Sequence, residues 1–505
     1  MRGIYNSVTD LRRKVFAAIA SMAYEDCDDL AKRIEQIPYE LLPGDKATYR
    51  NSIFLERAII GERLRLGMGL PTRDAKEFKA LSDGIEESAI AKKYYDDPLI
   101  NIIKFACNAC PEKKVFVTNA CQGCLSHQCT EVCPKDAIHI VNGRSLIDQD
   151  KCIKCGRCME ACPYKAITKI ERPCAASCGM DAIHSDEDGK AVIDYDKCVS
   201  CGMCLVNCPF GAIVDKGQIF QTIYAMKEGH RVVAAVAPAF VGQFGPSVTP
   251  EKLTAALKEL GFSDVVEVAI GADLCTIEEA EDFMEKVPEK QPWMATSCCP
   301  AWSVMAKKLF PQYASYISMA LTPMVLTARM IKKDDPDCKV VFIGPCAAKK
   351  LEASRKSVRS DVDFVLTFEE VMGMFVAKGV KLEEIEGNDP LVKGTNRGRE
   401  FAVSGGVAKA VKSLINKKHP EVEVKVQAAE GLKNCKTMLM MAKAGRLDGY
   451  LLEGMACPGG CVAGAGTLQP IAKSSAAVKK YANENTLVNC DESPYGDRLE
   501  ELTKG

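Results

Sequence analysis

The sequence predicts a chain of three parts: an N-terminal helical domain, a cysteine-rich α+β domain, and an α/β domain with mainly parallel sheets. Three observations lead to this expectation. Apolar residues recur at spacings of three and four through residues 1–95, cysteine, proline and glycine dominate residues 105–215, and β-rich runs alternate with helical stretches beyond residue 228. A chain of 505 residues also exceeds what one hydrophobic core usually supports. We place the boundaries at 1–100, 101–224 and 225–505.

The N-terminal part is expected to hold helices at 11–24, 27–37, 51–69 and 74–95, because apolar side chains repeat on one face of each segment. The stretches LPGDK and GLPTRD, with their proline and glycine, supply breaks between them. Cys27 has no second cysteine at ligand spacing, so we expect it to be a core residue. Nothing in this part indicates its function.

The composition excludes several classes of protein. The 66 basic and 67 acidic residues nearly balance, and no apolar stretch approaches the length of a membrane span, so we expect neither nucleic-acid binding nor membrane insertion. The 26 cysteines, most of them in short-spaced groups, favour metal ligation in a reducing compartment over a disulfide framework, and we expect the cytoplasm. Arg12 and Arg13 precede an apolar run as in a twin-arginine export signal, but the run is short and continues with helical spacing.

The cysteine-rich part contains the motif C-x2-C-x2-C-x3-C-P twice and a close variant once. This spacing is typical of [4Fe-4S] binding, because the tight loop wraps three thiolates around one cluster while the fourth cysteine reaches a second cluster. A zinc site normally needs only two pairs of cysteines. The two motifs are Cys152, Cys155, Cys158 and Cys162, and Cys198, Cys201, Cys204 and Cys208; the variant is Cys121, Cys124, Cys129 and Cys133.

Crossed ligation and an internal repeat predict the ligand sets. Cys174 aligns with Cys129, and Cys178 aligns with Cys133. Three clusters are therefore expected on Cys121, Cys124, Cys129 and Cys162, on Cys152, Cys155, Cys158 and Cys133, and on Cys198, Cys201, Cys204 and Cys178. A fourth would use Cys107, Cys110, Cys174 and Cys208; the alternative is three clusters and four ordinary thiols. The first eight of these cysteines resemble those of a two-cluster bacterial ferredoxin.

Several clusters in series carry electrons between a surface and a buried site. Six basic residues stand against two acidic ones at 151–172, and such a patch can steer an acidic ferredoxin or be an ordinary solvated face. The basic residues are Lys151, Lys154, Arg157, Lys165, Lys169 and Arg172.

Three further cysteine segments lie far apart in the α/β part: TSCCPAW at 296–302, GPCAAKKLEA at 344–353 and LEGMACPGGCVAGAG at 452–466. Adjacent side chains diverge, so Cys298 and Cys299 are expected to face different surroundings; the alternative is that both are small buried residues. Cys299, Cys346, Cys457 and Cys461 could bind one more [4Fe-4S] cluster from three loops, where the glycines of PGGC let the backbone approach the metal.

In the order and spacing of these three segments the sequence resembles the catalytic domain of the [FeFe]-hydrogenases, over about 225–475, or 105–475 with the ferredoxin-like part. The resemblance implies two lobes with mainly parallel sheets around a buried site. It also implies an H-cluster, which is a [4Fe-4S] cluster joined through a cysteine sulfur to a di-iron unit with CO, cyanide and a bridging dithiolate amine. Cys299, Cys346, Cys457 and Cys461 would hold it, with Cys461 as the bridge.

The resemblance implies roles for further residues. Cys298 would pass protons beside the bridging amine. Lys349 would bind an iron-bound cyanide, Met455 would pack near the bridging carbonyl, and Ala237 and Pro238 would line the other cyanide. A relay of Glu279, Ser318 and Asp282 would join Cys298 to solvent; the two carboxylates lie three residues apart and share a helix face. Taken without the resemblance, Lys349 is a plain surface lysine and the carboxylates are solvated.

The sequence departs from the family pattern at five positions. Gly344 replaces a methionine, Ala239 a serine, Met324 a glutamine, Asp282 shortens a carboxylate, and Ala465 interrupts a glycine run. These changes resemble a divergent group of the family, often called group B. They bear on the hydrogen bonding of the cavity, and hence on rate, catalytic bias and response to oxygen.

The sequence therefore predicts a cytoplasmic [FeFe]-hydrogenase that catalyses 2H⁺ + 2e⁻ ⇌ H₂, with ferredoxin or a similar carrier as partner and dedicated maturation proteins for the di-iron unit. One alternative is a hydrogen-sensing relative, which commonly carries an added sensory domain and lacks the proton-relay cysteine. Another is an iron–sulfur assembly or carrier protein, which lacks the intact PCxxK and CPGGC arrangement.

Overall fold

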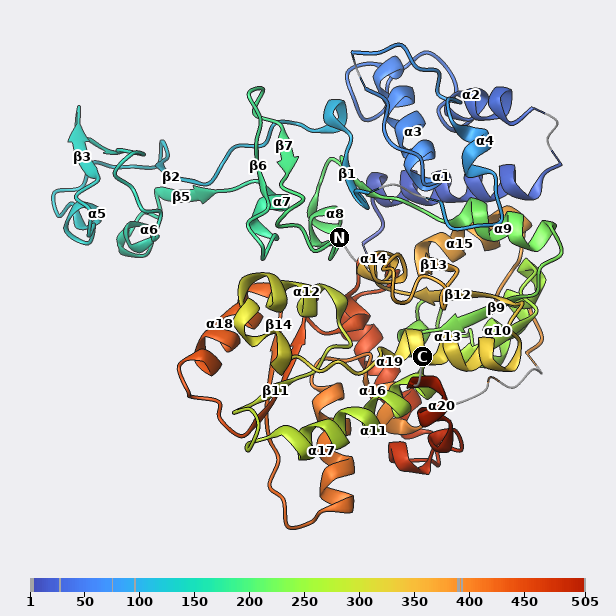
Figure 1. Ribbon diagram of the computed structural model, residues 1–505. Helices are drawn as coiled ribbons and strands as arrows, with labels where there is room; N and C mark the ends of the chain where they lie inside the picture. The colour runs from blue at the N-terminus through green and yellow to red at the C-terminus, as the bar shows by residue number, and fades with distance from the viewer. Residues whose placement is uncertain are drawn as a thin grey trace.

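The computed structural model describes residues 4–26, 29–74, 76–94, 97–387, 391 and 394–503, so Cys27 lies outside the described residues. The helical N-terminal part and the α/β part form a broad body, and part of the cysteine-rich region projects from one side of it (Figure 1). In the ranges that the structure describes, no helix has the length and apolar character needed to span a membrane.

The N-terminal part forms helices at three of the four expected segments: α1 (Ser7–Tyr24), α2 (Leu30–Leu41) and α3 (Ile53–Gly67). Asn6 starts α1 by accepting hydrogen bonds from the N–H groups of Val8 and Thr9, each at 3.0 Å. Helix α1 crosses α15 (Phe368–Lys378) closely, because a Cβ atom at Gly373 would lie only 2.6 Å from Phe16 Cβ.

The prediction of a helix at 74–95 is wrong for most of the described residues of this segment, where only α4 (Ile85–Ser88) is helical. Gly84 interrupts the segment with a φ of 78°. Phe78, which contributed to the apolar spacing, is fully exposed at 100%, so the pattern does not mark one buried helix face.

The cysteine-rich part forms an outer and an inner lobe. In the outer lobe β2 (Lys114–Val117) pairs with β5 (Ile167–Ile170) and β3 (Ile138–Val141) pairs with β4 (Arg144–Ile147), beside α5 (Gln128–Glu131) and α6 (Arg157–Ala161). In the inner lobe β6 (Ile183–Ser185) pairs with β7 (Ala191–Ile193) and β1 (Ile100–Ile102) pairs with β8 (Ile213–Asp215), beside α7 (Pro173–Ala176) and α8 (Met203–Asn207). The inner lobe lies between the outer lobe and the body (Figure 1).

The C-terminal part contains two parallel sheets, which confirms the predicted α/β class. One has the order β10-β9-β12-β13, with β9 (Val232–Val236), β10 (Asp264–Glu267), β12 (Lys339–Gly344) and β13 (Phe364–Thr367). The other has the order β11-β15-β14, with β11 (Met294–Ala295), β14 (Lys425–Glu430) and β15 (Tyr450–Met455). All five residues of β9 are buried, as expected for a parallel strand covered on both faces.

Helices pack around these sheets. They are α9 (Ile219–Lys227), α10 (Pro250–Leu260), α11 (Ala269–Lys286), α12 (Pro300–Leu309), α13 (Pro323–Asp334), α14 (Ala348–Ala353), α16 (Asn396–Glu400), α17 (Gly406–Lys418), α18 (Leu432–Lys443), α19 (Ile471–Asn483) and α20 (Leu499–Thr503). In open parallel sheets ligands bind beyond the carboxyl ends of the strands, so the loops after β9, β11, β12 and β15 are the place to look for a site.

Candidate metal centres and the buried cavity

A cavity lies at the carboxyl ends of strands from both parallel sheets. Its lining holds five thiols and one charged side chain, that of Lys349, and is otherwise apolar apart from backbone atoms. The thiols are those of Cys298, Cys299, Cys346, Cys457 and Cys461. The structure thus gathers the five cysteines of three distant segments around one space.

Cys299 lies at the start of α12, in the turn that follows β11. Trp302 Nε1 donates a hydrogen bond to Thr296 O at 3.0 Å, which fixes this turn. Burial raises the pKa of Cys299. Burial, and next the charge of Glu279, raises the pKa of Cys298 well above its ordinary value, so Cys298 is a protonated thiol at neutral pH.

The loops of the second and third segments approach each other at backbone distance. A Cβ atom at Gly464 would lie 2.2 Å from the carbonyl oxygen of Pro345, next to Cys346. Gly460 has a φ of 88°, and a Cβ atom there would lie 2.5 Å from Ser404 N. Both positions therefore require glycine.

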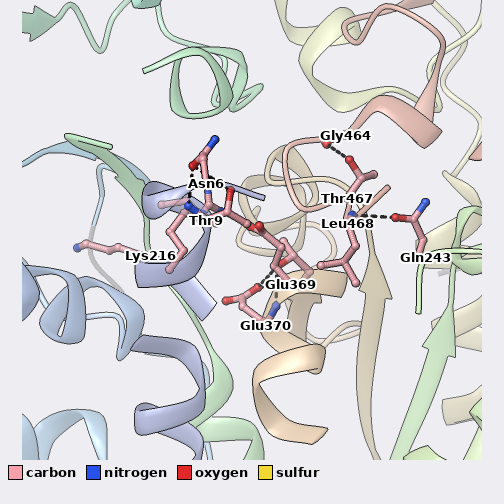
Figure 2. Close-up of polar contacts among 12 residues, drawn as sticks. Asn6, Thr9, Lys216, Gln243, Glu369, Glu370, Gly464, Thr467 and Leu468 are labelled. Atoms are coloured by element: carbon pink, nitrogen blue, oxygen red, sulfur yellow. Dashed lines mark hydrogen bonds and ion pairs between the residues drawn. The ribbon is translucent and has the colours of Figure 1, made fainter. Parts of the chain in front are cut away.

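Hydrogen bonds hold the chain that follows Cys461, as Figure 2 shows. Thr467 Oγ1 donates to Gly464 O at 2.9 Å, and Leu468 N donates to Gln243 Oε1 at 2.8 Å. This loop is consequently anchored to the segment after β9, which carries Ala237 and Pro238 into the same cavity.

Lys349 points its charge toward the Cys298 turn and is 9% exposed. Its Nζ donates to Cys298 O at 3.3 Å and to Glu352 Oε2 at 2.7 Å. Burial alone lowers the pKa of Lys349, but the pairing with Glu352 outweighs burial and the pKa lies above the ordinary value. Thr322 Oγ1 donates to the other Glu352 oxygen at 2.6 Å. Glu352 was not predicted, although its position three residues after Lys349 on a helix could have suggested it.

Four of the five departures from the family pattern, all but Asp282, lie at the cavity or next to residues that line it. Met455 lines it together with Ala239 and Met324. Gly344 stands beside the ring of Phe342, which also lines the cavity; a Cβ atom at Gly344 would lie 2.5 Å from Phe342 Cε1. Phe342 therefore fills the space that a longer side chain at position 344 would need.

Glu279 on α11 is fully buried (0% exposed) beside the Cys298 turn. Ser297 N donates to its Oε1 at 3.2 Å, Ser318 also hydrogen-bonds it, and its Oε2 has no hydrogen-bond partner among the described residues. Burial raises the pKa of Glu279 to about 8. The structure thus brings Cys298, Glu279 and Ser318 together.

Asp282 lies one turn further along α11, and within the described ranges no hydrogen bond joins it to Cys298, Glu279 or Ser318. It forms an ion pair with Lys286 at 2.8 Å, and its side chain is 24% exposed. Glu278, which the sequence did not single out, is half-buried, and its Oε2 has no hydrogen-bond partner within the described ranges. Burial raises the pKa of Glu278.

The cysteine loops of the two lobes repeat two backbone shapes. The residue two positions after Cys107, Cys121, Cys152 and Cys198 is left-handed in each case: Ala109 (φ 47°), Gly123 (58°), Lys154 (59°) and Ser200 (52°). Three positions after Cys133, Cys162, Cys178 and Cys208 a second left-handed residue follows: Asp136, Lys165, Asp181 and Gly211. One residue later an N–H donates to the cysteine sulfur, from Ala137 at 3.3 Å and from Ala166, Ala182 and Ala212 at 3.4 Å. The Cys107 segment shares the shape of the other three opening loops.

Two of the four expected ligand sets line small cavities of their own. Cys133, Cys152, Cys155 and Cys158 line one, and Cys107, Cys110, Cys174 and Cys208 line another. For the remaining sets the contacts are partial. Ser145 hydrogen-bonds both Cys121 and Cys129 of the first set, whose other members are Cys124 and Cys162. In the other set Cys178, Cys198 and Cys201 all act on the pKa of Cys204, which burial raises.

The inner lobe approaches the large cavity through Gly202. A Cβ atom there would lie 2.6 Å from Ala465 Cβ and 3.3 Å from Ala347 Cβ, next to Cys346. Cys299 also acts electrostatically on Cys201. The cysteine set of Cys201 therefore lies against the thiols of the large cavity.

The expected basic patch needs one correction. Arg172 is 3% exposed and donates to Cys110 O at 2.7 Å, so it does not belong to the surface. The other five basic residues lie on the outer lobe, which also carries the exposed Cys155.

The donor sets fit clusters better than single ions. In the described ranges no three His, Cys, Asp or Glu side chains stand close enough to hold one metal ion. The thiols instead surround cavities, and cubane clusters are held in this way by four separated thiolates.

Comparisons with known proteins agree with this arrangement. Residues 230–465 match a family model described as the C-terminal domain of the iron only hydrogenase large subunit, and residues 146–168 and 190–213 match models of 4Fe-4S binding domains. The periplasmic [Fe] hydrogenase large subunit of Nitratidesulfovibrio vulgaris is 32% identical over 389 residues, which cover 66% of this chain and 87% of that protein. The chain belongs to the iron-only hydrogenase family.

Two further relatives of the chain have names that describe different roles. Iron hydrogenase 1 of Clostridium pasteurianum is 30% identical over 387 residues, covering 66% of this chain and 67% of that protein. Cytosolic iron-sulfur assembly component 3 of Bos taurus is 28% identical over 280 residues, covering 45% of this chain and 58% of that protein. The predicted family and the iron–sulfur character are confirmed.

Proposed function

We propose that the protein is an [FeFe]-hydrogenase that interconverts protons, electrons and H₂ in the large cavity, in the cytoplasm. The observation that carries this proposal is the lining of that cavity, where four thiols for a cluster, the separate thiol of Cys298 and the cation of Lys349 converge in apolar surroundings. A ferredoxin or similar carrier would exchange the electrons.

Cys299, Cys346, Cys457 and Cys461 would hold the H-cluster, with Cys461 as the bridge to the di-iron unit. When bound, this group supplies an iron with an open coordination position and a nearby amine, where protons and electrons combine to H₂. Burial raises the pKa of Cys346 to about 11 and that of Cys461 to about 12, so these thiols release their protons when metal binds. Dedicated maturation proteins would deliver the di-iron unit.

Three side chains would act on that group: Lys349 would bind a ligand of the iron, and Cys298 and Glu279 would transfer protons. Lys349 presents a cation that Glu352 holds in place in a dry cavity, where it would bind an anionic cyanide ligand. Cys298 remains a neutral thiol, so it can donate one proton and accept another. Glu279 carries a proton near neutral pH and, with Ser318, connects Cys298 toward solvent. Ala237, Pro238 and Met455 would shape the apolar wall.

Electrons would enter at the outer lobe and reach the cavity through the inner lobe. Cys155, Lys151, Arg157, Lys165 and Lys169 are exposed on the outer lobe, and Gly202 of the inner lobe contacts the loops beside Cys346 and Cys461. Four accessory clusters on the expected cysteine sets would form this route.

Hydrogen evolution by protein matured with its di-iron unit tests the proposal, with chemically reduced viologen as electron donor. Cys298→Ala should lower turnover by roughly 10²–10⁴-fold, the usual range for loss of a proton-transfer group. Cys338→Ala is the matched control, because Cys338 is also a buried thiol (2% exposed) but does not line the cavity. Equal turnover of the Cys298 variant and wild type would contradict the proton role.

Assembly or delivery of iron–sulfur clusters is the second candidate, favoured by the likeness to the assembly component of Bos taurus. In that case the protein would lack hydrogen evolution even when fully matured, and the replacement of Cys298 would leave cluster transfer to an acceptor apoprotein unchanged. Hydrogen evolution that depends on Cys298 decides for the first candidate.

A further inference from the structure

Three arginine side chains contact the segments that carry Cys107, Cys110, Cys174 and Cys208. Arg172 lines the cavity that these four cysteines also line. Its Nη2 donates to Cys110 O at 2.7 Å, to Ser185 Oγ at 2.7 Å and to Gly189 O at 3.0 Å. The guanidinium is thereby locked beside one of the four cysteine segments.

Two more arginines, from the helical N-terminal part whose role the sequence left open, hydrogen-bond backbone next to this cavity without lining it. Arg50 Nη2 donates to Ala106 O at 3.0 Å and to Phe210 O at 3.1 Å. It therefore bridges the residue before Cys107 and a residue two positions after Cys208. Arg63 on α3 is 4% exposed and donates to Gly211 O. The helical N-terminal part therefore places two cations on the backbone next to this cavity.

Among the described residues, these cations have no carboxylate in direct contact with their guanidinium groups, although Glu112 acts electrostatically on Arg172 and the carboxylate of Glu56 accepts a hydrogen bond from Arg50 N at 2.7 Å. Within the described ranges, neither Arg50, Arg63 nor Arg172 has a carboxylate at ion-pair distance, whereas Arg33 of the same helical part pairs with Glu25 at 3.3 Å and with Glu40 at 2.6 Å. Burial lowers the pKa of Arg63 to about 10, which still leaves the side chain charged at neutral pH. The three guanidinium groups donate instead to backbone carbonyls and one hydroxyl.

We propose that Arg50, Arg63 and Arg172 are positioning residues for the cluster on Cys107, Cys110, Cys174 and Cys208, and that their charges raise its reduction potential. The inference rests on the fourth cluster of the proposed function. A [4Fe-4S] cluster with four thiolates is an anion, and reduction adds one more negative charge. Cations without a carboxylate in direct contact stabilise the reduced form more than the oxidised form, and most strongly where water is excluded, as around Arg63 and Arg172.

The cavity lies on the proposed electron route, where a cluster with a raised reduction potential would retain an electron. Cys110 precedes β2 and Cys174 follows β5, so the cavity lies where the chain passes between the inner lobe and strands β2 and β5 of the outer lobe. Electrons that enter at the outer lobe pass this point before they reach Gly202. The cluster would hold an electron there.

The test is a redox titration followed by electron paramagnetic resonance, on full-length protein carrying its [4Fe-4S] clusters without the di-iron unit. The double variant Cys107→Ser, Cys110→Ser identifies the signal of this cluster by its loss. Arg63→Gln should lower the ratio of reduced to oxidised cluster at a fixed potential at least tenfold, which equals a shift of about 59 mV for one electron. Arg63→Lys, which keeps the charge, and the control Arg33→Gln should leave the midpoint close to wild type.

Three results separate the possibilities. An unchanged midpoint in Arg63→Gln at full iron content overturns the proposal. If Arg63→Gln loses iron, the titration is repeated on Arg50→Gln, because Arg50 is only half-buried and its replacement disturbs the fold less. An unchanged midpoint in Arg50→Gln also overturns the proposal. If the cysteine double variant keeps every signal and all its iron, the fourth cluster itself is absent, which is a failure of the proposed function and not of the arginines.

Discussion

Replacement of Glu279 by glutamine should lower catalysis and raise stability at the same time. Glu279 is fully buried, and burial holds its pKa at about 8 against 4.5 in a free chain. The folded protein therefore keeps a proton that the unfolded chain releases between these two pH values. The stability contributed by the protonated form is complete below pH 4.5 and is lost as the pH rises through 8.

The size of the stability effect follows from these pKa values. At pH 7 the retained proton costs the folded state about 3 kcal/mol relative to a side chain that does not ionise. Glutamine keeps the oxygen that accepts the Ser297 N–H at 3.2 Å but carries no ionisable proton. The stability advantage of Glu279→Gln over wild type should therefore widen by about 2 kcal/mol between pH 5.5 and pH 7.5.

Two assays on the same variant check both halves of this prediction. Denaturant unfolding of the anaerobic protein at the two pH values gives the stability difference, and viologen-driven hydrogen evolution should fall by roughly 10²–10⁴-fold because glutamine cannot pass a proton. Glu281→Gln is the control, since Glu281 is exposed on the same helix. Wild-type turnover, or a stability difference that does not change with pH, would refute the assignment of Glu279 as a buried proton carrier.

Two further replacements test the packing around the site. Lys350 is 0% exposed and pairs with Asp215 at 2.8 Å and Glu370 at 3.0 Å, so Lys350→Met should destabilise the protein by about 3–5 kcal/mol in denaturant unfolding, and a loss below 1 kcal/mol would contradict the buried pairing. Gly344→Met should cost about 1–3 kcal/mol because its Cβ would lie 2.5 Å from the Phe342 ring, and Phe342→Leu in the same chain should recover most of that loss. Additive losses in the double variant would show that the two side chains do not compete for the same space.

The sequence was most informative where chemistry restricts residue type and spacing. Cysteine spacing identified the loops of the two lobes, because in the C-x2-C-x2-C motif three thiolates of one cluster come from one tight turn. The motifs around Cys299, Cys346 and Cys461 likewise identified segments that the structure brings to one cavity, since ligands at the ends of parallel strands converge. The apolar runs of β9 and β12 gave the parallel sheets for a similar reason, because strands buried on both faces cannot alternate.

The remainder depends on contacts between distant segments, which spacing does not encode. Phe78 looked like part of a helix face, yet its surroundings leave it exposed. Arg172 sat within a basic stretch, yet the fold turns it inward to Cys110. The approach of Arg63 to Gly211 joins residues 148 positions apart, and no local pattern marks it.

Infrared spectroscopy of anaerobically matured protein tests the central claim most directly, because CO and cyanide on iron absorb where protein does not. The account predicts bands of both ligands in wild type and in Cys298→Ala, and their loss when Cys461, the assigned bridge to the di-iron unit, is replaced by serine. Bands that survive in Cys461→Ser, or wild-type protein that matures without them while its [4Fe-4S] clusters are complete, would contradict it.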